Sequence, residues 1–106
     1  MDKILIHREL ITKTAVTGGF SVNTIRLEGI CKQIVVEPDT STTSYILTIT
    51  DDHGLVVFET ETETGNFPEL TELPMYGIYT VTISSATADE EFKIQLILKV
   101  WPYYIE

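Results

Sequence analysis

The chain has 106 residues, a formal net charge of −9 and a hydrophobic fraction of 43%. This length predicts one domain over residues 1–106 with a single core, and the apolar content argues against disorder. Nucleic acid and anionic lipid are disfavoured as partners because they share the negative charge. No run approaches the ~18 apolar residues of a membrane-spanning helix, and Asp2, Lys3 and Arg8 interrupt any signal-peptide apolar region.

The first third of the chain predicts three strands. Thr17-Gly18-Gly19 separates residues 9–14 from residues 20–27, which is a hairpin signal. Residues 30–37 form a mostly apolar run rich in β-branched side chains, as pleated surfaces prefer. Within this run Cys31 is the single cysteine, so an internal disulfide is excluded and a small buried side chain is expected.

The middle of the chain continues with strand and turn signals. Residues 44–50 alternate, with Tyr45, Leu47 and Ile49 on one predicted face. Residues 51–54, Asp-Asp-His-Gly, have turn chemistry, with Gly54 suited to a positive φ. A short apolar strand is expected over residues 55–60.

Pro68 and Pro74 bracket a stretch predicted to be irregular, from which Leu70 and Leu73 are expected to reach the core. Residues 78–84 alternate again, as do residues 91–101, which place a continuous apolar face opposite Lys93, Gln95 and Lys99. On that outer face Ile97 and Trp101 add apolar surface. Pro102 ends the ladder because it has no backbone donor, which leaves residues 102–106 as an aromatic tail.

No segment holds a helical period beyond about one turn. Seven or eight short strands at intervals of roughly 8–12 residues predict an all-β, antiparallel β-sandwich, immunoglobulin-like or jelly-roll-like, with a closed barrel as the alternative.

Between residues 33 and 92 the chain has no Lys or Arg and many carboxylates. Glu59, Glu61 and Glu63 alternate with threonines, so an extended backbone would place all three on one face. Like charges on such an edge resist aggregation. Calcium sites usually gather oxygens from a tight loop, and we therefore predict no metal.

Sequence motifs of catalysis are missing. His7 and His53 have no third ligand at a metal spacing, and no nucleophile elbow, phosphate-binding glycine loop or zinc-protease motif occurs. We therefore expect no enzyme, no catalytic residue and no cofactor. The candidate partner-contact residues are aromatic, because Trp and Tyr are enriched at interface hot spots: Tyr76, Trp101, Tyr103 and Tyr104.

Three segments together carry a family resemblance. They are residues 8–14 with the Gly-Gly turn, residues 28–39 (Glu-Gly-Ile-Cys-Lys-Gln-Ile-Val-Val-Glu-Pro-Asp), and residues 45–54 (Tyr-Ile-Leu-Thr-Ile-Thr-Asp-Asp-His-Gly). A Pro-Glu-Leu loop and two closing strands follow. Over residues 8–100 the chain resembles small β-sandwich structural proteins, such as head decoration proteins, of tailed bacteriophages.

The resemblance implies a virion component, made in the host cytoplasm, that binds the major capsid protein or another virion protein and forms a homo-oligomer on the particle. It implies no active site. Two alternatives remain open: a tail or connector component of the virion, and a carbohydrate-binding sandwich module whose exposed aromatics would stack on sugar rings.

Overall fold

The computed structural model describes residues 5–87 and 89–100, and its regular structure consists of β-strands. The strands are β1 (Leu5–Thr14), β2 (Phe20–Asn23), β3 (Leu27–Pro38), β4 (Ser44–Thr50), β5 (Val56–Glu59), β6 (Glu63–Thr64), β7 (Phe67–Gly77), β8 (Thr80–Ser84) and β9 (Glu91–Val100). Over the described ranges, no helix has the length and apolar character needed to cross a membrane. The predicted aromatic tail, residues 102–106, lies outside the described residues.

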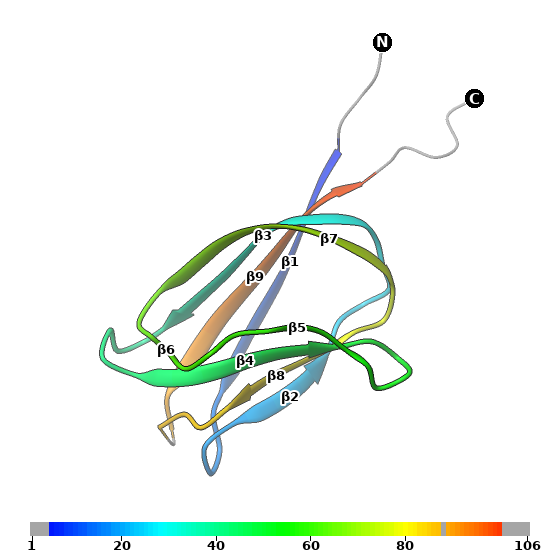
Figure 1. Cartoon of the computed structure of the whole chain (residues 1–106). Helices are drawn as coiled ribbons and strands as arrows, with labels where there is room; N and C mark the ends of the chain where they lie inside the picture. The colour runs from blue at the N-terminus through cyan, green and yellow to red at the C-terminus, as the bar shows by residue number, and fades with distance from the viewer. Residues whose placement is uncertain (1–4, 88, 101–106) are drawn as a thin grey trace, which may run out of the picture.

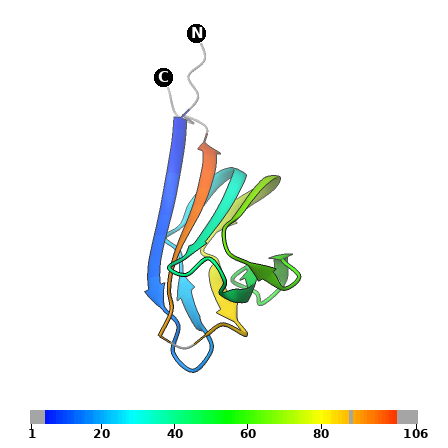
Figure 2. The same ribbon diagram turned by 90° about the vertical axis from the view of Figure 1, so that its left-hand side faces the viewer.

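Two antiparallel sheets pack face to face as a β-sandwich (Figures 1 and 2). Sheet I has the strand order β1-β9-β3-β7, and sheet II has the order β2-β8-β4-β5, with β6 also paired to β4. The chain changes sheet at almost every connection, which is the strand order of a jelly roll and differs from the order of immunoglobulin domains. The predicted sandwich is confirmed, and of its two predicted forms the strand order matches the jelly roll.

The two predicted turns behave differently. Residues 51–54 join β4 to β5, which pair directly, and Gly54 has a φ of +83°. Thr17 and Gly18 also form a tight turn with positive φ angles, closed by a bridge between Val16 and Gly19. However, β1 continues into sheet I and β2 into sheet II, so the expected paired hairpin is wrong beyond that single bridge.

The core lies between the two sheets and follows from the alternation in β4, β8 and β9. Phe92, Ile94, Leu96 and Leu98 of β9 are fully buried, as are the alternating side chains of β4 and Val81 of β8. The Phe92 ring meets the Tyr45 ring edge-on at a centroid distance of 5.3 Å. Burying such side chains stabilises the fold by roughly 1.5–3 kcal/mol each, which makes this alternation the main determinant of the sandwich.

The prediction for residues 68–74 is wrong in part. These residues belong to the edge strand β7, not to an irregular stretch, and Leu70 is 77% exposed. Leu73 does pack against the core. The register of β3 against β7 shifts between Cys31 and Gln33, so that Leu73 lies opposite buried Cys31 whereas Leu70 lies opposite outward-facing Gln33.

Tyr45 ties the core to the connection after β6. Its ring is fully buried, and its hydroxyl donates a hydrogen bond of 2.7 Å to the carbonyl oxygen of Gly65. Burial, with a smaller contribution from the negative charge of Glu63, raises the pKa of Tyr45 to about 12 from the ordinary value of 10.

This raised pKa predicts an alkaline loss of stability. Unfolded Tyr45 ionises near pH 10, whereas the folded protein keeps its proton until about pH 12. The associated stability is therefore complete below pH 10 and falls by up to about 2 kcal/mol as the pH rises to 12. We expect Tyr45→Phe to flatten this part of the curve of unfolding free energy against pH, measured by urea denaturation. Equal slopes in both proteins would contradict the assignment.

Candidate binding surface

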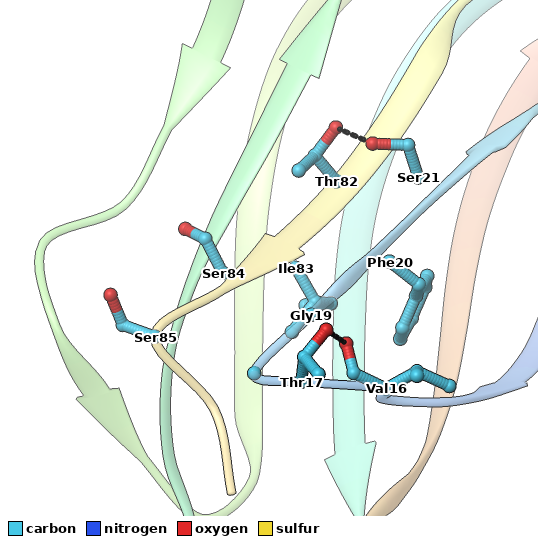
Figure 3. A pocket seen from close by; sticks show the side chains of 10 residues that line it. Val16, Thr17, Gly19, Phe20, Ser21, Thr82, Ile83, Ser84 and Ser85 are labelled. Carbon is cyan, nitrogen blue, oxygen red and sulfur yellow. Dashed lines mark hydrogen bonds between the residues drawn. The ribbon is translucent and has the colours of Figure 1, made fainter. Parts of the chain in front are cut away.

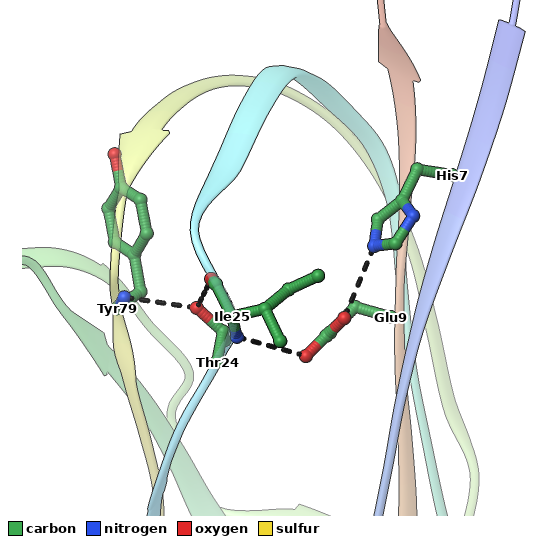
Figure 4. A network of polar contacts seen from close by, with 5 residues as sticks. All are labelled: His7, Glu9, Thr24, Ile25 and Tyr79. Carbon is green, nitrogen blue, oxygen red and sulfur yellow. Dashed lines mark hydrogen bonds and ion pairs between the residues drawn. The ribbon is translucent and has the colours of Figure 1, made fainter.

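The polar side chains between the sheets have structural partners. His7 Nε2 lies 3.2 Å from Glu9 Oε1, and the Ile25 amide donates to Glu9 Oε2 at 3.3 Å (Figure 4). Thr24 Oγ1 accepts from the Tyr79 amide at 3.1 Å and donates to the Ile25 carbonyl. This network fastens β1 of sheet I to the loop between β2 and β3. His7 is half-buried.

The turn between β4 and β5 brings together the side chains of Asp51, Asp52 and His53, whose potential ligand atoms lie within 4.8 Å of one another. Asp51 Oδ1 already accepts hydrogen bonds from the backbone amides of Leu55 and His53, both 2.9 Å, and the amide of Leu55 is the main cause of the lowered pKa of Asp51. These contacts agree with the interpretation of residues 51–54 as a turn.

The predicted row of three glutamates does not form. The backbone leaves the strand conformation between β5 and β6, over residues 60–62. Glu59 lies opposite Thr48, on the outer face of sheet II, whereas Glu63 lies opposite inward-facing Tyr45. Because the break changes the alternation, these carboxylates do not share one face.

A shallow hollow of about 480 Å³ lies beside the turn between β1 and β2, lined by residues 16–21 and 82–85 (Figure 3). Its polar groups are hydroxyls and backbone amides, and Ser21 Oγ is hydrogen-bonded to Thr82 Oγ1 at 2.9 Å. The described lining has no carboxylate, imidazole, amine or thiol to exchange a proton, which acid–base catalysis requires.

The outer face of sheet I is unusually apolar. Cross-strand neighbours fix which side chains share this face, in three rows from β1 to β7. The rows are Ile6–Lys99–Ile30–Pro74, Arg8–Ile97–Gln33–Leu70 and Leu10–Gln95–Val35–Pro68. We call these positions the apolar–basic face. Ile6 and Leu10 on β1 and Leu70 on β7 are each more than half exposed, and half-buried Ile30, Val35 and Ile97 lie between these two edges. Exposed apolar side chains gathered on one face mark interaction sites.

The charge on this face differs from that of the whole protein. Arg8 and Lys99 are the charged members of the three rows, and the ion pair of Lys32 with Glu72 lies beside them at the register shift, whereas the whole chain has 16 acidic and 7 basic residues. The next row adds Lys93 together with Glu37. A partner for the apolar–basic face should therefore present apolar side chains together with carboxylates.

The outer face of sheet II has the opposite character. Thr48, Thr50, Thr80 and Thr82 occupy its two central strands, and their cross-strand partners are mostly polar. Thr80 donates to Asn23 Oδ1 at 2.9 Å, and Thr48 donates to Glu59 Oε2 at 3.1 Å. Because these groups already bond to one another, covering this face gains little free energy.

Of the four predicted contact residues, only Tyr76 is described. It is 57% exposed and lies opposite Glu28 on the outer side of sheet I, next to the apolar–basic face. Trp101, Tyr103 and Tyr104 lie outside the described residues. The prediction missed Leu10 and Leu70, although the apolar Ile97 on the outer side of the last strand was a signal for this face. Among the described residues, no other aromatic side chain is exposed, so no platform of adjacent rings forms there.

No protein-family model matches the chain, and a comparison with curated protein sequences also finds no match. Solved structures share the fold at low identity. A structure from Bacillus endospore appendages, described as disulfide-linked pili, has 13% identity and a TM-score of 0.58, covering 94% of this chain and 91% of that chain. The periplasmic inhibitor of g-type lysozyme from Aeromonas hydrophila has 10% identity and a TM-score of 0.50, covering 87% and 85%.

A structure of infectious bursal disease virus also matches, with 10% identity and a TM-score of 0.40, covering 97% of this chain but 33% of that chain. The two matches with TM-scores of 0.50 or more share the β-sandwich fold with this chain. At such identities they show the fold alone, because one fold hosts many unrelated functions.

Unfolding measurements can test the difference in stability contribution between a core side chain and a side chain of the apolar–basic face. Leu70→Ser should change the unfolding free energy by no more than about 0.5 kcal/mol, because the side chain is already in water. Leu96→Ala, in the core, should cost about 2–5 kcal/mol. Denaturant titration measures both, and a large loss in Leu70→Ser would show that this face is covered within the monomer.

Proposed function

We propose that this chain is a non-catalytic virion structural protein, a head decoration protein that binds the lattice of the major capsid protein through its apolar–basic face. The observation that supports this proposal is the outer face of sheet I, where Leu10, Leu70 and Ile6 stand exposed among basic and amide side chains. An isolated soluble domain gains nothing from such a face, whereas a lattice-bound domain buries it.

The energetics suit a repeated lattice. Covering one exposed leucine contributes roughly 1.5–3 kcal/mol, and Arg8 orients the domain against carboxylates of the partner. Association also costs about 4–15 kcal/mol in lost freedom of motion. If copies on the particle also contact one another, modest individual contacts combine through avidity. In this arrangement the hydroxyl-rich outer face of sheet II and the turn at residues 51–54 face the solvent.

The resemblance to phage head proteins over residues 8–100 supports the same proposal, as does a jelly-roll fold of the kind found in capsid domains. In this proposal the protein contacts neither nucleic acid nor membrane. A tail or connector protein would use the same face, but it would be present as a small ring of copies, not as many copies over the head surface.

Quantitative mass spectrometry of gradient-purified particles tests the proposal through presence and copy number. Re-addition of the purified chain to particles that lack it then tests the surface. Leu70→Lys should weaken binding about 30-fold, because about 2 kcal/mol of apolar burial is lost. Val56→Lys is the matched control, since Val56 is 56% exposed on the outer side of sheet II, opposite Thr50.

Particles without the protein would exclude a virion role. Equal losses of binding in the two variants would exclude the apolar–basic face as the contact surface, even if the protein is a virion component.

A further inference from the structure

The sandwich has four sheet edges, and they are not equivalent. The edges of sheet II are β2 and β5, which are only four residues long. One edge of sheet I is β7, in which Pro68 and Pro74 lack the backbone donors that a further strand would need. The remaining edge, β1, runs for ten residues, Leu5–Thr14, without a proline.

The free side of β1 is a template for another strand. All ten residues of β1 pair with β9 on one side, which holds the strand extended. Within the described parts of the chain, no hydrogen bond joins the backbone of β1 to an element on its other side. A long edge of this kind readily pairs with a second chain unless like charges prevent it. The charges on β1 have mixed signs: Arg8 and Lys13 are basic, and Glu9 is acidic.

We propose that β1 pairs antiparallel with β1 of a second copy, so that two copies of sheet I form one continuous eight-stranded sheet. Antiparallel pairing of identical strands creates a two-fold axis perpendicular to the sheet, the isologous arrangement of symmetric dimers. Directly opposite residues must lie on the same face of the sheet. One residue of β1 therefore lies opposite its own copy at the centre of the pair. Moving this central residue by one position along β1 shifts the pairing of the two strands by two residues.

Charge selects among the central registers. Centring the pair on Glu9 places two carboxylates directly opposite each other, and centring it on Arg8 does the same for two guanidinium groups; both arrangements are destabilising. Centring it on Leu10 places Glu9 opposite Ile11 and forms no pair of opposite charges. Centring it on Ile11 places Glu9 opposite Lys13 on both sides of the axis, which forms two complementary pairs. We assign this last register.

The side chains in this register can make the contacts. Lys13 is exposed and takes part in no ion pair or hydrogen bond described in the monomer. Each oxygen of Glu9 accepts one hydrogen bond, from His7 or from the Ile25 amide, and a carboxylate has about four acceptor positions. Ile25, 58% exposed beside Glu9, adds apolar surface near the junction. Cys31 is fully buried, so the two folded copies associate without a disulfide.

The dimer would extend the apolar–basic face. Because the two-fold axis is perpendicular to the sheet, the outer faces of both copies point to the same side. Leu10 of each copy then lies opposite Thr12 of the other, close to the axis. The two apolar–basic faces become neighbours on one broad surface, which doubles the area that a single flat partner can cover.

Sedimentation equilibrium of the purified chain alone tests the pairing, independently of any capsid. We expect a monomer–dimer equilibrium in which Lys13→Glu raises the dissociation constant about tenfold, because two attractive pairs become repulsive. Lys93→Glu is the matched control, since it makes the same charge change on β9, away from the edge. It should leave the dimer unchanged.

Cysteine cross-linking tests the register. With the pair centred on Ile11, a variant carrying both Leu10→Cys and Thr12→Cys should form a disulfide-linked dimer on mild oxidation, because the two positions are opposite across the axis. Leu10→Cys alone should not cross-link. Three results would each overturn the proposal. The first is a chain that remains monomeric at millimolar concentration, and the second is a dimer equally sensitive to Lys13→Glu and Lys93→Glu. The third is cross-linking by Leu10→Cys alone.

Discussion

The burial of the inward side chains of β9 between its neighbours and sheet II is the interaction on which the rest of the structure depends. Phe92, Ile94, Leu96 and Leu98 lie on one face of this strand and are completely removed from water. β9 is also an inner strand of sheet I, paired with β1 on one side and β3 on the other. A change of register by one residue would expose all four side chains, so this strand fixes the positions of its neighbours as well as the core.

Once the register of β9 is fixed, its outward residues determine which side chains of β1 and β3 become neighbours on the outer face of sheet I. Gln95 lies between Leu10 and Val35, and Ile97 lies between Arg8 and Gln33, so side chains from distant parts of the chain become neighbours in rows. Each of these residues is ordinary by itself on a protein surface. Together they form an apolar surface with positive charge on a negatively charged protein. Sheet II, whose outer threonines bond to neighbouring polar side chains, makes no comparable surface.

The jelly-roll order also determines where the sandwich is open. β1 lies at an edge of sheet I, paired to β9, and among the residues that the structure describes no strand pairs with its other side. The opposite edge contains prolines, and both edges of sheet II are short. Hydrogen bonds of Glu9 with His7 and with the Ile25 amide fasten β1 to the loop between β2 and β3. An edge strand that is already extended and paired on one side suits repeated assembly, because little conformational freedom is lost on binding.

The sequence by itself determined the fold class, the core and most strands, because alternation of apolar side chains is a local property that each strand carries independently. The apolar faces predicted from alternation over residues 44–50, 78–84 and 91–101 are those that the structure buries. Only the tertiary structure decided the strand order, the exposure of Leu70, the separation of Glu59 from Glu63 and the composition of the apolar–basic face. Each of these depends on which residues lie opposite one another across strands, and on one register shift near Cys31. Such pairings join residues far apart in the chain, and local patterns do not specify them.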